Sequence, residues 1–260
     1  MRDSNLLNHV LITGASGGLG AALTRNYALT AKRLTLFGRS ESRLTAVANS
    51  VERQGLQIDL QFLDVCDASA MAKAISLADD QLAVNLAIAN AGIGGAISMA
   101  GKFGETPVNA SQIANTNFLG AINTIAPLVA PMIGRKQGKI AIISSLAALA
   151  PMPMAPTYAA AKAGLSAYAL NLGHLLRPHG IKVTLVEPGF IETPMSQELK
   201  GPQPFKMTAN EAAERIAHAV ALEKSKLTFP LSLAVLSRLA QYAPNVVVDY
   251  MSARWRRGQE

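Results

Sequence analysis

The sequence is poor in cysteine, histidine and charged residues, and each shortage excludes a class of protein. Its 260 residues include one cysteine, Cys66, which excludes an internal disulfide and is typical of a reducing compartment. The four histidines show no spacing typical of metal ligands, so we expect no metal site. Only 16% of the residues are charged and 50% are hydrophobic, which excludes a disordered chain and predicts a folded globular protein.

The sequence also lacks an uninterrupted apolar segment of the kind that crosses a membrane or directs secretion. Residues 1–9 include Asp3 and no long apolar core, which a secretory signal needs. Residues 140–161 are uncharged but contain three prolines, so we expect a buried strand, an apolar loop and the start of a helix there. We therefore predict a cytoplasmic protein.

The chain is basic, with a net charge of +7 and an isoelectric point near 9.7. This charge is compatible with anionic partners, although it also serves solubility alone. A surface that binds single-stranded nucleic acid usually interleaves basic and aromatic residues. Here Arg254, Arg256 and Arg257 surround a single aromatic residue, Trp255, so we predict no nucleic-acid partner.

Short apolar runs alternate with helix-like stretches along the chain. We predict strands at residues 10–13, 34–37, 60–63, 86–90, 139–144 and 182–186, and helices near residues 19–30, 41–54, 68–78, 110–135 and 156–176. This alternation is typical of an α/β fold, a doubly wound parallel sheet with helices on both faces. No linker or repeat divides the pattern, which predicts a single domain over residues 1–260. Ligands of such sheets bind beyond the carboxyl ends of the strands, so functional residues should follow the strands.

The first predicted strand ends in a glycine-rich turn, Thr13-Gly14-Ala15-Ser16-Gly17-Gly18-Leu19-Gly20. Glycines let the backbone turn tightly and approach a pyrophosphate at the N-terminus of the following helix. The alternative is a turn that needs glycine only for its own geometry. Its place between the first strand and the first helix favours a phosphate site.

The second predicted strand ends at Gly38-Arg39, where a site for an unphosphorylated ribose usually has a carboxylate. Arg39 instead offers a planar guanidinium suited to a phosphate, with Ser16 and Arg43 near in sequence to assist. This pattern favours NADP(H) over NAD(H). The alternative is an arginine that is merely solvated.

Tyr158 and Lys162 are four residues apart, which places them on one face of a helix. A free tyrosine has a pKa of about 10, and a neighbouring ammonium favours the phenolate. We expect Lys162 to lower the pKa of Tyr158. The same spacing occurs by chance on many helices, so the surrounding motifs decide between the two interpretations.

Together these segments resemble the short-chain dehydrogenase/reductase family in its single-domain form. The cofactor turn TGxxxGxG matches residues 13–20, NNAG matches Asn90-Ala91-Gly92, and the serine and YxxxK active site matches Ser145 and Tyr158-Ala159-Ala160-Ala161-Lys162. Pro188-Gly189 matches the PG turn. The motifs span residues 10–193 in the family's order, and the resemblance implies a Rossmann-like fold.

The resemblance implies a role for each matching residue. Tyr158 would be the general acid, Ser145 would hold the substrate carbonyl with Ser144 as the neighbouring alternative, Lys162 would lower the tyrosine pKa and hold the nicotinamide ribose, and Asn117 would hold a water that connects Lys162 to solvent. Asp64 and Val65 would contact adenine, and Ile191 and Thr193 the carboxamide. The full set implied for the cofactor is Gly14, Ser16, Gly18, Leu19, Gly20, Arg39, Asp64, Val65, Asn90, Ala91, Gly92, Tyr158, Lys162, Pro188, Gly189, Ile191 and Thr193.

The sequence departs from the family pattern at two places. Ala89 replaces the first asparagine of NNAG, and Ser145-Leu146-Ala147-Ala148 lacks the glycine that often follows the serine. The first change affects loop support and the second shapes the substrate pocket. Neither removes a group that the reaction needs.

The expected function is NADP(H)-dependent hydride transfer between a carbonyl and a secondary alcohol. Apolar pocket walls from residues 93–103, 146–156 and 190–207 favour an apolar or lipid-like substrate, with residues 189–207 as a lid. The alternatives are a reductase of a sugar or surface-polysaccharide precursor and a catalytically silent NADPH-binding protein. The helix at 110–135 and the helix starting near Pro156 carry more apolar residues than one sheet face needs. The resemblance implies that these helices pair between subunits, so we predict a homodimer or homotetramer.

Residues 224–260 form a basic C-terminal extension with six basic and two acidic residues, a net charge of +4. Its apolar runs at 227–236 and 246–248 are interrupted by prolines, which excludes one spanning helix. One interpretation is a strand and helices that complete the sheet, cover the pocket and join a subunit interface. The other is a patch that touches anionic membranes weakly through apolar residues and through Arg254, Arg256 and Arg257.

Overall fold

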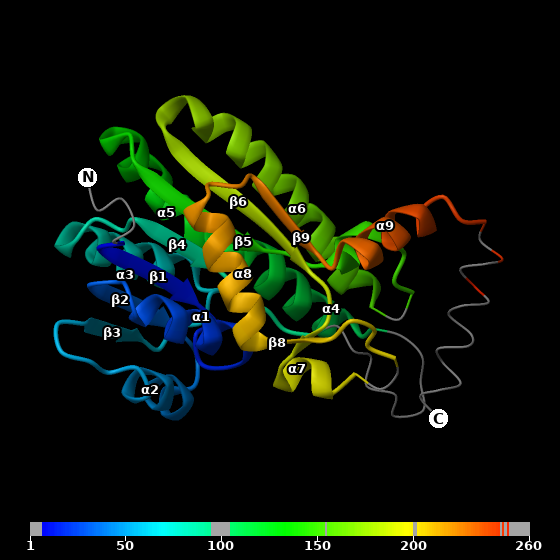
Figure 1. Cartoon of the computed structure of the whole chain (residues 1–260), viewed down its shortest axis with the longest axis horizontal. Coiled ribbons are helices and arrows are strands. Elements are labelled where there is room, and N and C mark those ends of the chain that lie inside the picture. The colour runs from blue at the N-terminus through cyan, green and yellow to red at the C-terminus, as the bar shows by residue number, and fades with distance from the viewer. Residues whose placement is uncertain are drawn as a thin grey trace.

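The computed structural model describes residues 7–94, 105–153, 155–199 and 202–244, with Val246 and Asp249. Its centre is a parallel sheet of seven strands in the order β3-β2-β1-β4-β5-β6-β9 (Figure 1). The strands are β1 (His9–Thr13), β2 (Arg33–Phe37), β3 (Gln57–Gln61), β4 (Leu86–Ala89), β5 (Gly138–Ile143), β6 (Ile181–Pro188) and β9 (Lys226–Phe229). The predicted doubly wound parallel sheet is confirmed.

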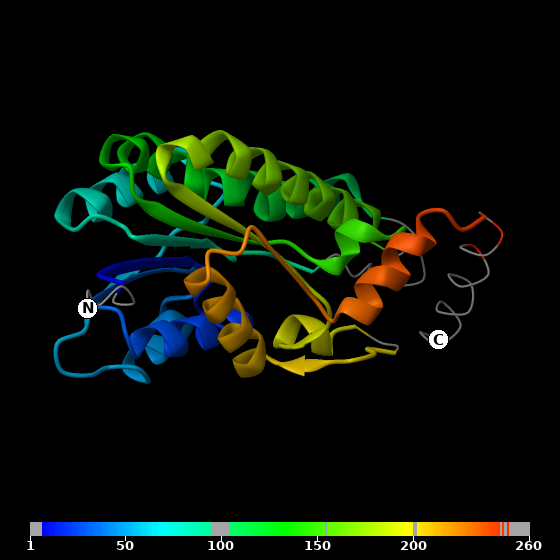
Figure 2. The same ribbon diagram turned by 45° about the horizontal axis from the view of Figure 1, so that its top comes forward.

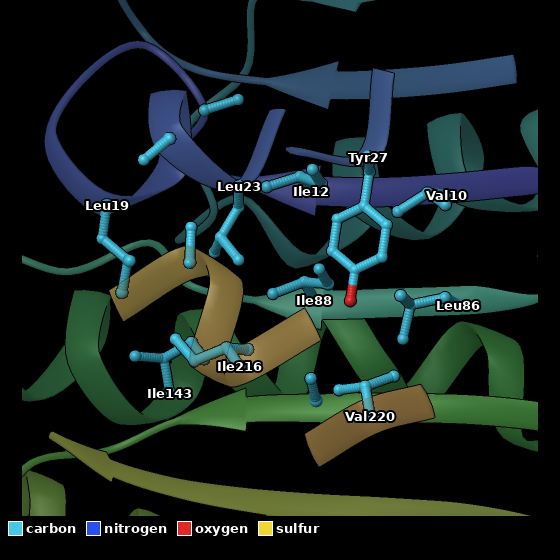
Figure 3. Packing of buried hydrophobic residues seen from close by; sticks show 14 of the residues in the cluster. Val10, Ile12, Leu19, Leu23, Tyr27, Leu86, Ile88, Ile143, Ile216 and Val220 are labelled. Atoms are coloured by element: carbon cyan, nitrogen blue, oxygen red, sulfur yellow. The ribbon is translucent and has the colours of Figure 1, made fainter. Parts of the chain in front are cut away.

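Helices cover both faces of the sheet, as Figure 2 shows. One face carries α1 (Gly18–Ala28), α2 (Glu41–Asn49) and α8 (Ala209–Ala221), and the other carries α3 (Ala68–Gln81), α5 (Gly120–Arg135) and α6 (Pro156–Leu176). Successive strand residues therefore enter two separate apolar layers. On β1, Val10 and Ile12 pack into one layer and Leu11 into the other, and all three are fully buried. Figure 3 shows the first layer, with Tyr27 of α1 among strand residues and Val220 of α8.

The helix predicted at residues 110–135 is divided by a wider turn. It consists of α4 (Pro107–Ala114), a π-helical turn η1 (Asn115–Leu119) and α5. By length and composition the run Pro107–Arg135 could cross a membrane, with a mean hydropathy of 1.3. However, Ile125, Leu128 and Met132 are fully buried in the core of this fold. The run is therefore explained as a core helix.

The chain after β6 builds the rim around the carboxyl ends of the strands. It contains β7 (Ile191–Glu192), α7 (Pro194–Gln197), β8 (Met207–Thr208) and then α8, and our predicted elements include none of these four. The strand and helix expected in the C-terminal extension are present as β9, which extends the sheet beside β6, and α9 (Leu231–Ala240). The short helices η2 (Leu146–Leu149) and η3 (Arg177–His179) follow β5 and α6.

Candidate active site

The predicted site residues follow the carboxyl ends of β1 to β6 or lie on the helices packed there. The chain proceeds outward from β1 to β2 and β3 in one direction, and from β4 to β5, β6 and β9 in the other. The connections that follow β1 and β4 therefore diverge. In doubly wound sheets, dinucleotides bind beyond the carboxyl ends of the strands at such a point.

The glycine turn after β1 adopts a backbone that other residues would not tolerate. Gly14 and Gly18 have φ values of 67° and 55°, in the left-handed region. A Cβ on Gly20 would lie 2.0 Å from the Gly14 carbonyl oxygen, so the turn closes only with glycine there. Gly17 precedes α1 with no side-chain cap, and the first turn holds no acidic residue. Its backbone N–H groups therefore suit a pyrophosphate.

Asn90 fastens the end of β4 to this turn. Its side-chain Nδ2 donates to the backbone oxygens of Thr13 at 3.0 Å and Gly14 at 3.3 Å. The Thr13 hydroxyl oxygen accepts from the backbone N–H groups of Asn90 and Ala91. The Asn90 amide thus shapes the turn, and its predicted contact with the cofactor stays a prediction.

The groups expected around an adenosine lie together beyond β1, β2 and β3. If Gly38 carried a Cβ atom, that atom would lie 3.2 Å from the Ser16 hydroxyl oxygen. Ser16 therefore lies beside Gly38, the residue that precedes Arg39. Arg39 Nη1 lies 3.4 Å from Asp64 Oδ2, and both side chains are exposed. Burial alone would raise the pKa of Asp64, but hydrogen bonds from Cys66 and the Arg39 cation hold it below its usual value.

Ser145, Tyr158 and Lys162 lie around the end of β5. The Ser145 hydroxyl oxygen accepts from the Ala147 backbone N–H at 3.1 Å and so begins η2. Tyr158 and Lys162 are one turn apart on α6, and Lys162 Nζ lies 5.9 Å from the centroid of the Tyr158 ring. The Lys162 ammonium donates to the Ile143 carbonyl oxygen. The structure therefore brings these three predicted residues together.

The electrostatics of this group differ from our expectation. Burial raises the pKa of Tyr158, and a hydrogen bond with Ser145 offsets this only in part. The prediction that Lys162 lowers the tyrosine pKa is therefore wrong for the polypeptide by itself. Burial also lowers the pKa of Lys162 to about 8, because the charged amine is withdrawn from water. Tyr158 keeps its proton at neutral pH, as a proton donor must.

Asn117 occupies the π-helical turn η1 and is fully buried. Its Oδ1 accepts from the Ile93 backbone N–H at 2.8 Å, and its Nδ2 donates to the Ile93 carbonyl oxygen at 2.9 Å. A Cβ on Gly92 would lie 3.1 Å from Asn117 Oδ1 and 3.7 Å from Lys162 Nζ. Asn117 therefore orients the loop after β4 against Lys162, and its predicted water stays a prediction.

The hydroxyl contacts of Ser144 show that it has a different role from Ser145. It lies 2.8 Å from the carbonyl oxygen of Lys162 and 2.8 Å from the Ser166 hydroxyl. Ser166 in turn donates to the buried carboxylate of Glu187 at 3.0 Å. Ser144 is therefore part of the attachment of α6 to the sheet, and Ser145 is the serine beside Tyr158.

Sequence reasoning missed the two carboxylates that hold α6. The Glu187 carboxylate pairs with Lys226 Nζ of β9 at 2.7 Å. The Glu105 carboxylate accepts from the Thr157 backbone N–H at 3.1 and 3.2 Å and caps the helix just before Tyr158. A single glutamate at the end of the apolar run Val183–Val186 was the available signal for Glu187. Glu105 carried no comparable signal.

The segment after β6 lies over the glycine turn. Gly189 donates its backbone N–H to the Phe229 oxygen at 2.7 Å, directly after Pro188. Ile191 is buried in β7. Thr193 lies close to Gly18, since a Cβ atom on Gly18 would be 3.1 Å from the Thr193 methyl carbon. The Thr193 hydroxyl oxygen accepts from the Ser196 backbone N–H and caps α7.

Two predicted cofactor residues are mainly core residues. Leu19 is buried among α1, α8 and the sheet, and Val65 is buried where a Cβ on Gly120 would approach its Cγ2 to 2.5 Å. Their predicted contacts with a cofactor stay predictions. Among the residues that the structure describes, no group of three or more His, Cys, Asp or Glu could hold a metal ion.

The expected substrate walls contain five described methionine and phenylalanine residues. Met152, Met195 and Phe205 are exposed, and Phe190 and Met207 are partly buried. Met154 and residues 95–103 of the expected wall lie outside the described residues.

Comparison with known proteins agrees with this geometry. Residues 8–203 match the family described as short chain dehydrogenase. An uncharacterized oxidoreductase of Myxococcus xanthus is 32% identical over 95% of this chain and 96% of its own. A fatty acyl-CoA reductase of Acinetobacter baylyi is 28% identical over 81% of this chain and 72% of its own.

Solved structures share the fold at lower identity. A Mycobacterium paratuberculosis short chain dehydrogenase bound to NAD has a TM-score of 0.75 and 20% identity, over 86% of this chain and 97% of that one. An actinorhodin polyketide ketoreductase variant with NADPH has a TM-score of 0.77 and 21% identity, over 90% and 99%. The chain belongs to the short-chain dehydrogenase/reductase family. It is thus an oxidoreductase of a family whose members use a nicotinamide cofactor.

Proposed function

We propose that this chain is an NADP(H)-dependent oxidoreductase that interconverts a carbonyl and a secondary alcohol. The observation that carries the proposal is the group of Ser145, Tyr158 and Lys162 at the end of β5, on the same edge of the sheet as the uncapped N-terminus of α1 that follows β1. The protonated phenol of Tyr158 and the hydroxyl of Ser145 would both donate to the substrate oxygen, which gains negative charge during reduction.

The cofactor would supply the hydride, and the chain would supply orientation and a proton. Tyr158 donates its phenolic proton to the substrate oxygen, which suits the raised pKa that burial gives it. Ser145 donates a hydrogen bond to the same oxygen. Lys162, held by the Ile143 carbonyl, offers its remaining N–H groups to a ribose hydroxyl, and its positive charge favours the phenolate that remains once Tyr158 has given up its proton.

The preference for NADP(H) rests on Arg39. No carboxylate follows β2 at Gly38-Arg39, the Arg39 guanidinium is exposed, and Ser16 lies beside Gly38, the residue before Arg39. Asp64 pairs with this guanidinium and restrains it. We propose that the 2′-phosphate of NADP(H) binds the Arg39 guanidinium N–H groups that do not contact Asp64, with the Ser16 hydroxyl as a further donor.

We propose an apolar or lipid-like substrate on the basis of the described walls. Methionine and phenylalanine side chains at Met152, Phe190, Met195, Phe205 and Met207 contribute to them, and the segment at residues 189–207 that carries most of these side chains would act as a lid. The similarity to a fatty acyl-CoA reductase supports a substrate with a long acyl chain. A sugar or surface-polysaccharide precursor is less consistent with walls of this kind.

The oligomer and the location are also proposed. Val108 of α4 and Leu170 and Leu175 of α6 are exposed apolar residues, which supports a homodimer or homotetramer formed through these helices. The single cysteine supports a reducing, cytoplasmic setting. The whole chain 1–260 would act as one oxidoreductase domain.

The proposal is tested by following the oxidation of NADPH and NADH with carbonyl compounds of increasing acyl length and with keto sugars. We expect turnover with NADPH that improves with acyl length. Turnover restricted to keto sugars would assign the alternative substrate class. Tight NADPH binding without turnover of any compound would assign a silent cofactor-binding protein.

A further inference from the structure

The helix α9 presents a continuous apolar stripe on its outer side. Leu231, Val235 and Leu239 follow one another at intervals of four residues, which is the spacing of one helix face, and Tyr242 lies in the turn directly after the helix. Their exposed fractions lie between 58% and 86%, and Ala234 is the buried residue of the helix. A soluble surface rarely leaves a row of large aliphatic side chains open in this way.

We propose that the α9 stripe, made of Leu231, Val235, Leu239 and Tyr242, docks on an anionic lipid surface. Arg238 is the one charged residue of α9, and it is exposed. The sequence from residue 224 to residue 248 contains no aspartate or glutamate. An apolar face accompanied only by positive charge is complementary to acyl chains beneath anionic headgroups.

The surroundings of α9 favour a lipid surface over a second copy of the chain. A twofold pairing of this stripe would bring two Arg238 cations to one interface, and α9 has no carboxylate to balance them. A lipid surface meets Arg238 with phosphate groups instead. Tyr242, with an apolar ring and a polar hydroxyl, is a residue type that prefers the membrane interface.

The helix that carries the stripe also packs near the proposed catalytic group. Helix α9 follows β9 at the carboxyl edge of the sheet (Figures 1 and 2). It packs against η2, the short helix whose N-cap is Ser145. Met152 is exposed shortly after η2. This last step rests on the proposed function: a lipid-like substrate would pass from the membrane along α9 to Ser145.

The test is sedimentation of the full chain with vesicles of phosphatidylglycerol and phosphatidylcholine in equal amounts, at low and high salt. We expect binding at low salt that falls at high salt and is weak on pure phosphatidylcholine. Leu239→Ser should weaken binding several-fold, and Leu231→Ser with Leu239→Ser about tenfold or more. Arg238→Gln should weaken it about fivefold. Neutralising Arg254, Arg256 and Arg257, which lie outside the described residues, tests the rest of the extension.

Leu222→Ser is the matched control, because Leu222 is 56% exposed and ends α8 at the opposite edge of the sheet. It should leave vesicle binding within about twofold of wild type. Absence of binding, or equal loss in the α9 and Leu222 variants, would overturn the proposal. A dimer that Leu239→Ser dissociates without any vesicle binding would assign the stripe to a second copy.

A separate readout distinguishes this proposal from the proposed function. Oxidation of NADPH with a short, water-soluble ketone should be unchanged in Leu239→Ser, because Leu239 lies outside the proposed catalytic group. Turnover without vesicle binding would contradict only the proposed docking surface. Vesicle binding without turnover of any carbonyl would contradict the proposed oxidoreductase function and support the docking surface.

Discussion

The Lys162 ammonium donates a hydrogen bond to the Ile143 carbonyl oxygen at 2.9 Å, where β5 ends. Both residues are buried, with 4% and 5% of their surfaces exposed. The bond fixes the amine one helical turn from Tyr158, but a single carbonyl does not replace the water that a free ammonium would have. A group that the proposed reaction needs is therefore costly to the fold.

Lys162→Met should stabilise the fold near neutral pH and abolish turnover. Burial lowers the pKa of Lys162 from 10.5 to about 8, so the unfolded chain binds the proton more strongly between these values. The Lys162 contribution to stability therefore rises as the pH rises through this window and falls as the pH returns to neutral. The full difference corresponds to at most about 3 kcal/mol.

Thermal denaturation near pH 7 and near pH 10 measures this effect. The gain from Lys162→Met should be largest at neutral pH and should shrink towards pH 10. A variant less stable than wild type at neutral pH would show that the bond to Ile143 outweighs the cost of the buried charge.

Arg39→Ala should remove most of the preference for NADPH. A charge-assisted pair with a phosphate contributes about 1.5–3 kcal/mol, so NADPH affinity should fall about tenfold to a hundredfold while NADH affinity is unchanged. Asp64→Asn should have the opposite effect, because it frees Arg39 from its ion pair. Fluorescence titration with both cofactors checks this, with the exposed Arg25→Ala as control. Equal affinities of the wild type for NADPH and NADH would exclude the role of Arg39.

Tyr27→Phe should stabilise the protein by about 1 kcal/mol. The Tyr27 hydroxyl is buried and has no hydrogen-bond partner among the described residues. Its ring lies among Val10, Leu86 and Val220 (Figure 3). Burial raises the pKa of this phenol, so it stays neutral at all ordinary pH values. Chemical denaturation measures the change, and Tyr242→Phe on the exposed Tyr242 should have no effect. A destabilised Tyr27→Phe would indicate a partner for the hydroxyl.

Lys226→Met should cost more stability than Glu187→Gln. Glu187 is 1% exposed and its pair with Lys226 at 2.7 Å is the compensation for a buried charge, so loss of the lysine should cost about 3 kcal/mol. Glu187→Gln leaves the remaining charge on Lys226, which reaches solvent, and should cost about half as much. The double variant should recover part of the loss. Equal effects of the two single variants would contradict this asymmetry.

The central strands and the motif residues could be predicted from the sequence because both faces of the sheet are covered. Strands such as β5 are then continuous apolar runs, and the turns that follow carry glycine, asparagine and serine. The edge strand β3 was predicted too late, at residues 60–63, because Gln57–Gln61 alternates polar and apolar residues. Helix α2 ends at Asn49, earlier than the predicted residue 54, since Ser50 closes the helix and glycine follows at residue 55.

Other features depend on contacts between distant segments. The π-helical turn around Asn117 is set by the Ile93 backbone, which no helical periodicity reveals. The raised pKa of Tyr158 follows from burial, which spacing along α6 does not report. The support of α6 by Glu187 joins β6, β9 and α6.

The most direct test of the proposed function is the turnover number of Tyr158→Phe with NADPH and a ketone that the wild type reduces. Loss of the proton donor should lower kcat about a hundredfold to ten-thousandfold, while the NADPH dissociation constant changes less than about twofold. Tyr168→Phe, on the same helix, should keep wild-type kcat. A Tyr158→Phe enzyme with wild-type kcat would contradict the account, because the proton would then come from another group.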